Sequence, residues 1–201
     1  MSYREELIKY LQIPDNLNLA WEIADVMPDV KRHLRQEFWK CVHDRLVTKD
    51  LSGWTINKPQ VSFDNKAHYG LTIQPKEVSE REKLLWVFMM TENDRLWIGI
   101  QGNFRHTDLI GLAATRAKEL IDDLGKIGYK TTKSTVWSWN WVDDHSDRTL
   151  NEKSTLLEIA GSNAFGIEMA DVLWDFFEKY RSRLECINCG GNETSLKSGE
   201  N

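Results

Sequence analysis

The N-terminal quarter of the chain has apolar residues at helical spacing. After a short amphipathic segment at about residues 5–11, apolar side chains recur every three or four positions, which predicts helix from about 17 to 47. The stripe consists of Ile23, Met27, Val30, Leu34, Phe38, Cys41 and Val42. Pro28 lies inside the stripe without changing its phase. It therefore either opens a second helix or kinks one long helix.

The hydrophobic period changes after Gly53. Apolar and polar residues then alternate, as in strands with one solvated face, at Trp54 and Ile56, at Val61 and Phe63, and over 69–73. The apolar run 84–90 and the segment 96–100 are joined by a polar loop of hairpin length. This part of the chain predicts a four-stranded antiparallel meander.

The second half of the chain returns to helical periodicity. A helix is expected from Thr107 to about 127, where Gly128 stops it, followed by a strand over 137–141. A polar loop, a short helix near 154–160 and a final helix from about 164 to 184 come next. Residues 188–201 lack apolar periodicity and predict a flexible tail.

These elements predict one α+β domain over residues 1–187. It should contain a single antiparallel sheet of about five strands, with a long N-terminal helix, one crossover helix and C-terminal helices that cover the apolar face of the sheet. A chain of 201 residues is long enough for one domain of ordinary size.

Three of the nine tryptophans, Trp137, Trp139 and Trp141, are spaced two residues apart. Side chains alternate across a strand, so all three indoles are expected on one face, with Ser138 and Asn140 on the other. The favoured interpretation is a core strand beneath the helices. The alternative is a binding surface for stacked bases or a protein partner, with positive charge supplied by lysines that include Lys130 and Lys133.

Charge and composition narrow the class of protein. The net charge of −5 argues against extended contact with a phosphate backbone. Acidic residues near the N-terminus and three cysteines without regular spacing predict a cytoplasmic protein. The longest apolar run, 84–90, is far below the ~18 residues of a membrane span, so no membrane contact is expected.

Two clusters offer candidate metal ligands. Cys186 and Cys189 have the spacing of half a zinc ribbon, and Asp143, Asp144 and His145 gather carboxylates beside an imidazole. The favoured interpretations are tail thiols and a solvated turn, so we predict no metal and no cofactor. The sequence also lacks a nucleophile elbow, a phosphate-binding loop and a dinucleotide fingerprint.

The final helix carries an apolar arc wider than one sheet contact usually buries. We therefore expect part of it to form a homodimer interface or a contact with another protein, with Phe176 and Tyr180 pointing outward. The alternative is that the long N-terminal helix packs against the arc and covers it.

The order of segments resembles a known module. It runs from Leu34-Arg35-Gln36-Glu37-Phe38-Trp39-Lys40 through Leu96-Trp97-Ile98-Gly99-Ile100 and Gly128-Tyr129 to Trp137-Ser138-Trp139 and a final amphipathic helix. Over about residues 17–185 this is similar to the C-terminal accessory region of bacterial PD-(D/E)XK superfamily nucleases from defence and mobile-element contexts. The resemblance implies that nuclease chemistry belongs to a preceding segment, which we expect this chain to lack.

The segment of this chain most similar to that nuclease motif is Asp64 followed by Gln74-Pro75-Lys76, where glutamine replaces the usual acid. One carboxylate is poor magnesium ligation. We therefore expect a non-catalytic binding or regulatory protein of phage or defence origin that acts on a protein or nucleic-acid partner. The alternatives are a metal-dependent nuclease or other hydrolase using Asp64 and Lys76 or the loop 143–147, and nucleic-acid binding through the tryptophan strand.

Overall fold

A computed structural model describes residues 2–57, 70–76, 84–92, 94–142 and 148–192. The helices are α1 (Tyr3–Leu11), α2 (Pro14–Leu46), α3 (Gly111–Lys126), α4 (Lys153–Gly161) and α5 (Ala164–Asn192), with a short 3-10 turn at His106–Asp108. The strands are β1 (Trp54–Asn57), β2 (Gly70–Pro75), β3 (Leu85–Glu92), β4 (Arg95–Gly102), β5 (Lys130–Thr131) and β6 (Val136–Trp141).

The six strands form one antiparallel sheet in the order β1-β2-β3-β4-β6-β5. The predicted α+β class with a single antiparallel sheet is therefore confirmed. Strand β5 was not predicted, because two residues are too few to show a period. The predicted strand at Val61 and Phe63 lies outside the described residues.

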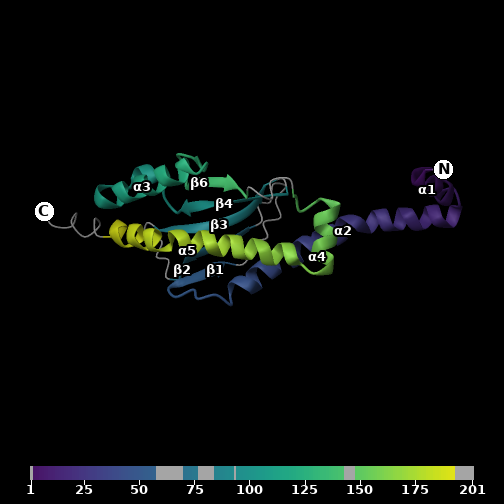
Figure 1. Cartoon of the computed structure of the whole chain (residues 1–201), viewed down its shortest axis with the longest axis horizontal. Coiled ribbons are helices and arrows are strands. Elements are labelled where there is room, and N and C mark those ends of the chain that lie inside the picture. Colours follow the sequence, from purple (N-terminus) through teal and green to yellow (C-terminus); the bar gives the residue numbers. More distant parts are fainter. Residues whose placement is uncertain (1, 58–69, 77–83, 93, 143–147, 193–201) are drawn as a thin grey trace.

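One face of the sheet is covered by helices. Helix α5 crosses the sheet with the C-terminal half of α2 beside it, and α3 packs against α5 and β6 (Figure 1). Strand residues such as Val87 and Ile100 are buried in the same core cluster as Phe38 of α2 and Phe177 of α5. Helix α2 continues through Pro28 as a single helix. No helix in the described part of the chain is long and apolar enough to cross a bilayer.

The strand that contains the tryptophans has a β-bulge, so the prediction that all three indoles share one face is wrong. The favoured core interpretation holds for Trp137 alone, since Trp139 and Trp141 are half-buried and lie on the other face of the sheet. The pairing of β4 with β6 shifts register between Ile100 and Gln101. A bulge places two consecutive residues on nearly the same side of a strand. Trp137 and Ser138 are accordingly both fully buried, and Trp137 belongs to the core beneath the helices.

The environment of Trp137 is that of a structural residue. Its Nε1 donates to the backbone oxygen of Phe104 at 3.0 Å, and the Phe104 ring meets the indole edge-on at 5.1 Å. The expectation that Ser138 faces solvent is also wrong, since Ser138 pairs with Ile100 on the core side of the sheet.

Helix α5 differs from its prediction in two respects. Phe176 and Tyr180 do not point outward: they are only 9% and 4% exposed, and Phe176 stacks on Tyr129 at 5.5 Å. The apolar arc is covered because α2 and α3 both pack against α5. The helix also extends to Asn192, so residues 188–192 are not part of a tail.

Asn188 explains why the last turns of α5 stay on the sheet. Its side chain accepts a hydrogen bond from the backbone N–H of Leu85 at 2.8 Å and donates to the backbone oxygen of Leu85 at 3.1 Å. Both residues are buried. One amide side chain thus satisfies both backbone groups of Leu85 at the start of β3, as a neighbouring strand would.

Replacing Asn188 by Ala should lower the free energy of unfolding by about 2–6 kcal/mol, because two buried backbone groups lose their partners at about 1–3 kcal/mol each. Urea denaturation of the purified protein measures this loss. Ser182→Ala, at an exposed position of the same helix, is the control and should change stability by less than ~0.5 kcal/mol. Equal stability of the two variants would refute the role of Asn188.

Candidate functional site

The face of the sheet opposite the helices carries a row of aromatic side chains. Phe88, Trp97, Trp139 and Trp141 come from β3, β4 and β6, and we call them the aromatic row. Successive rings meet edge to face, with centroids 4.7 Å, 5.5 Å and 5.4 Å apart. Phe88 is fully buried, whereas the three tryptophans are half-buried.

The register of the strands creates this row. Phe88 and Trp139 both pair with Gly99, and Trp97 pairs with Trp141, so the four rings share one side of the sheet. Gly99 leaves the space that the rings fill. A Cβ at this position would lie 2.9 Å from Cζ of Phe88 and would overlap the backbone oxygen of Ser138.

Two cations lie over the tryptophans at the β6 end of the row. The guanidinium carbon of Arg95 is 4.6 Å from the centre of the Trp141 ring, and Nζ of Lys130 is 4.7 Å from that of Trp139. At exposed sites such cation–π contacts contribute about 0.5–1 kcal/mol each. Lys133, the other predicted binding lysine, is exposed between β5 and β6.

A groove with a volume of 380 Å³ lies beside the aromatic row. Its lining is formed by Met90, Glu92, Trp97, Gln101, Thr132, Val136 and Trp139. Apolar and aromatic groups therefore form much of the lining, with one carboxylate, one amide and one hydroxyl among them. Such a mixture suits binding, since these residues do not supply an activated nucleophile or a pair of carboxylates.

The other predicted site residues that the structure describes do not gather in a second site. Cys186 and Cys189 are free and exposed on α5. Lys76 is exposed just beyond β2, and its backbone N–H donates to the oxygen of Gly53. Asp64, Asp143, Asp144 and His145 lie outside the described residues. Within the described ranges, no three His, Cys, Asp or Glu side chains gather as metal ligands.

Cys41 is the third free cysteine. It is a residue of α2, and its side chain faces Asn163, which precedes α5. Burial raises the pKa of its thiol above the usual value, and the thiol donates to the backbone oxygen of Asn163 at 3.8 Å. A cysteine nucleophile requires the opposite shift, toward the thiolate. Cys41 therefore packs as a structural thiol.

Sequence reasoning found two members of this site, Trp139 and Trp141, together with Lys130. It missed Phe88, Trp97 and Arg95. A usable signal was present, since the run 84–90 is apolar at every position, whereas a strand with one solvated face alternates. Apolar side chains on both faces of β3 indicate that something other than water contacts the second face.

Comparison of the chain with family models, with curated proteins and with solved structures finds no match.

The two kinds of tryptophan on β6 should respond differently to truncation. Trp137→Ala should cost about 3–5 kcal/mol, because it empties a fully buried site. Trp139→Ala should cost less than half of that loss, because its ring is half-buried and can be replaced by water. Denaturant titration of both variants tests this difference. Similar losses would show that Trp139 belongs to the core.

Gly99→Ala should displace the Phe88 ring and disturb the aromatic row, with a cost of about 1–3 kcal/mol from overpacking. Near-ultraviolet circular dichroism should report the altered tryptophan packing. Gly125→Ala is the matched control, since an added Cβ there meets no atom within 4 Å and the helix α3 favours Ala. An unchanged spectrum for Gly99→Ala would contradict the geometry of the row.

Proposed function

We propose that this chain is a non-catalytic binding protein whose aromatic row and adjoining groove bind an extended segment of a partner protein. The observation that carries the proposal is the row of half-buried tryptophans on the sheet face opposite the helices. Trp, Met and Arg are enriched at the centres of protein interfaces, where they account for most of the binding energy. All three residue types occur in or beside this groove.

A protein segment fits this surface better than a nucleic acid. Bases stack on exposed ring faces, but one face of Trp139 is occupied by Lys130 and one face of Trp141 by Arg95. The rings are also nearly perpendicular to one another, at 81° and 85°, so they do not form a continuous platform for successive bases. Glu92 in the groove and the net charge of −5 disfavour phosphates further.

The same residues define the chemistry of the partner segment. Its apolar side chains would contact Met90, Trp97 and Val136 in the groove, and its acidic side chains would pair with Lys130 and Arg95. We therefore propose a segment in which aromatic or aliphatic residues are flanked by Asp or Glu.

We further propose that the chain acts in the cytoplasm as a counterpart of a nuclease accessory module. The support for this setting is the order of sequence segments from Leu34 to Trp139 and the three cysteines, all of which are free thiols. A neighbouring gene for a nuclease, a methylase or a phage protein would support this setting. Neighbours confined to unrelated metabolism would oppose it.

Selection from a random 12-residue peptide library tests the proposed binding. Selected peptides should combine apolar and acidic residues and bind the wild-type protein with micromolar Kd in calorimetry. Trp139→Ala and Trp141→Ala should each weaken binding at least tenfold, since a hot-spot side chain contributes about 2 kcal/mol or more. Trp174→Ala is the control, because Trp174 is a partly buried tryptophan of α5 in the helical layer.

Two outcomes would contradict this proposal. Peptides that bind Trp139→Ala and Trp141→Ala as tightly as the wild type would place the binding surface elsewhere. Binding of a labelled single-stranded DNA or RNA 20-mer that is lost in Trp139→Ala would replace the protein partner by a nucleic acid. Variant stability is measured in parallel, so that unfolding is not mistaken for lost binding.

Incubation with single- and double-stranded DNA and RNA in the presence of Mg²⁺ or Mn²⁺ tests the catalytic alternative. We expect no cleavage. The segment most similar to a nuclease motif has glutamine at position 74 in place of an acid, and the one remaining carboxylate is poor magnesium ligation. Cleavage that disappears in both Asp64→Ala and Lys76→Ala would identify a nuclease and refute a purely binding function.

A further inference from the structure

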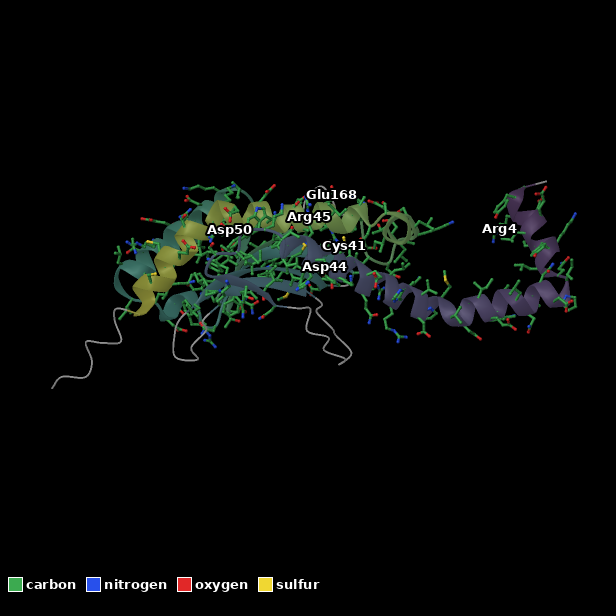
Figure 2. The ribbon with its side chains drawn as sticks, turned by 90° about the horizontal axis from the view of Figure 1, so that it is seen from below. Arg4, Cys41, Asp44, Arg45, Asp50 and Glu168 are labelled. Atoms are coloured by element: carbon green, nitrogen blue, oxygen red, sulfur yellow. The ribbon has the colours of Figure 1, made fainter. Side chains whose placement is uncertain are left out.

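The N-terminal arm, which we define as residues 3–30, projects from the body of the protein. Figure 2 shows Arg4 near its tip, far from Cys41 in the body. No residue of α1 is buried, and the first buried residue of α2 is Phe38. The arm contacts itself at the tip, where Nδ2 of Asn16 donates to the backbone oxygen of Tyr10 at 2.9 Å.

The arm exposes an unusual amount of apolar surface. Twelve large apolar side chains are 43–80% exposed: Tyr3, Leu7, Ile8, Tyr10, Ile13, Leu17, Leu19, Trp21, Ile23, Val26, Met27 and Val30. At ~150–250 Å² for each buried aromatic side chain, the three aromatic residues alone leave roughly 300–500 Å² in water. These twelve side chains lie on two helices and on several sides of the arm, so one partner can cover only part of this area. Apolar surface on this scale is still unusual, because a typical monomer exposes ~300–600 Å² in its largest patch.

The apolar residues of α2 form a seam with coiled-coil spacing. Ala20, Ile23, Met27, Val30 and Leu34 follow one another at intervals of three, four, three and four. The last of them, Leu34, packs against the protein's own core, so the part of the seam that a partner can cover ends at Val30. All acidic residues of this stretch, Asp15, Glu22, Asp25 and Asp29, fall at positions outside that seam. Two such helices can therefore bury their seams against each other while every carboxylate stays in water.

The charges along α2 favour an antiparallel pair. From 12 to 30 the helix has four acidic residues and no lysine or arginine, whereas Lys31, Arg32 and Arg35 follow at the base of the arm. A parallel pair would place the acidic stretches beside each other. An antiparallel pair places the acidic tip of one arm beside the basic base of the other.

The base of the arm also has a receiving surface. A pocket of 390 Å³ is lined by Ala24, Met27, Pro28, Lys31, Arg35 and Asn151. Arg35 is held there by an ion pair with Asp94 at 3.1 Å and by the backbone oxygen of Leu150. When Ile23 of one copy lies opposite Met27 of a second copy, Asp15 and Leu17 at the tip of the second copy's arm lie beside this pocket of the first copy.

We propose that two copies of this chain associate through their arms, as an antiparallel two-fold pair of α2 helices. Closed two-fold pairing is the commonest arrangement of homo-oligomers and uses the same patch of both copies. The pairing covers the exposed seam and also explains how a helix of this length stays folded beyond the body, since long helices are stabilised mostly by packing of an apolar face. This surface is separate from the aromatic row.

Sedimentation velocity of the full chain from 1 to 100 µM measures the association. The wild type should have twice the 23.4 kDa mass of the chain. Ile23→Glu with Met27→Glu places charges in the seam and should give a monomer. Asn18→Glu with Trp21→Glu adds the same two charges to exposed positions outside the seam, and this control should still dimerise.

Charge reversal tests the antiparallel direction. Asp15→Lys and Lys31→Asp should each raise the Kd of the dimer about tenfold, because Asp15 of one copy lies opposite Arg35 of the other and one helical turn from its Lys31, and this contact occurs twice in a two-fold dimer. The double variant with both changes should restore wild-type affinity. Additive weakening in the double variant would overturn the antiparallel arrangement.

Cross-linking provides a readout that does not depend on seam variants folding well. With Cys41, Cys186 and Cys189 replaced by Ser, Ala24→Cys should form an intermolecular disulfide on mild oxidation, whereas Leu157→Cys on the exposed side of α4 should not. A wild type that is monomeric at 100 µM, or a dimer that persists in Ile23→Glu with Met27→Glu, would overturn the proposal. A persistent dimer would place the contact between copies outside the seam.

Discussion

The β-bulge between β4 and β6 determines on which side of the sheet each tryptophan lies. Without it, strict alternation would place Trp137 beside Trp139 and Trp141. The register shift at Ile100 and Gln101 instead turns Trp137 into the core and leaves the other two on the opposite face. The same strand thus contributes an anchor to the hydrophobic core and two rings to the candidate binding surface.

The helical layer makes that division stable. Helix α5 lies between α2 and α3, so its wide apolar arc is covered within the chain, and Asn188 fixes its last turns to β3. Because this side of the sheet is filled, the aromatic row on the other side is held on a rigid support. A rigid row loses little conformational freedom on binding, which favours affinity.

The two proposed surfaces lie on different parts of the molecule and draw on different chemistry. The aromatic row combines tryptophans with Arg95 and Lys130, whereas the arm has an aliphatic seam with acidic residues outside it. An arm-mediated dimer would present two aromatic rows at once. Two linked sites bind a partner with repeated segments more tightly than one site does.

The sequence alone determined the class of fold and most of its elements. Helical spacing over 17–47 and alternation after Gly53 are local properties of the chain, and they predicted α2 and the antiparallel sheet. Strand periodicity and nearby charge are also local, and they predicted Trp139, Trp141 and Lys130 as candidate binding residues.

Tertiary structure decided the rest. The bulge that separates Trp137 from its neighbours depends on pairing with β4, and Phe176 and Tyr180 are buried because two other helices cover α5. Tertiary structure also decided that the arm is exposed. Helix α2 packs against the core only from Leu34 onward, and no spacing in the sequence marks where that contact begins.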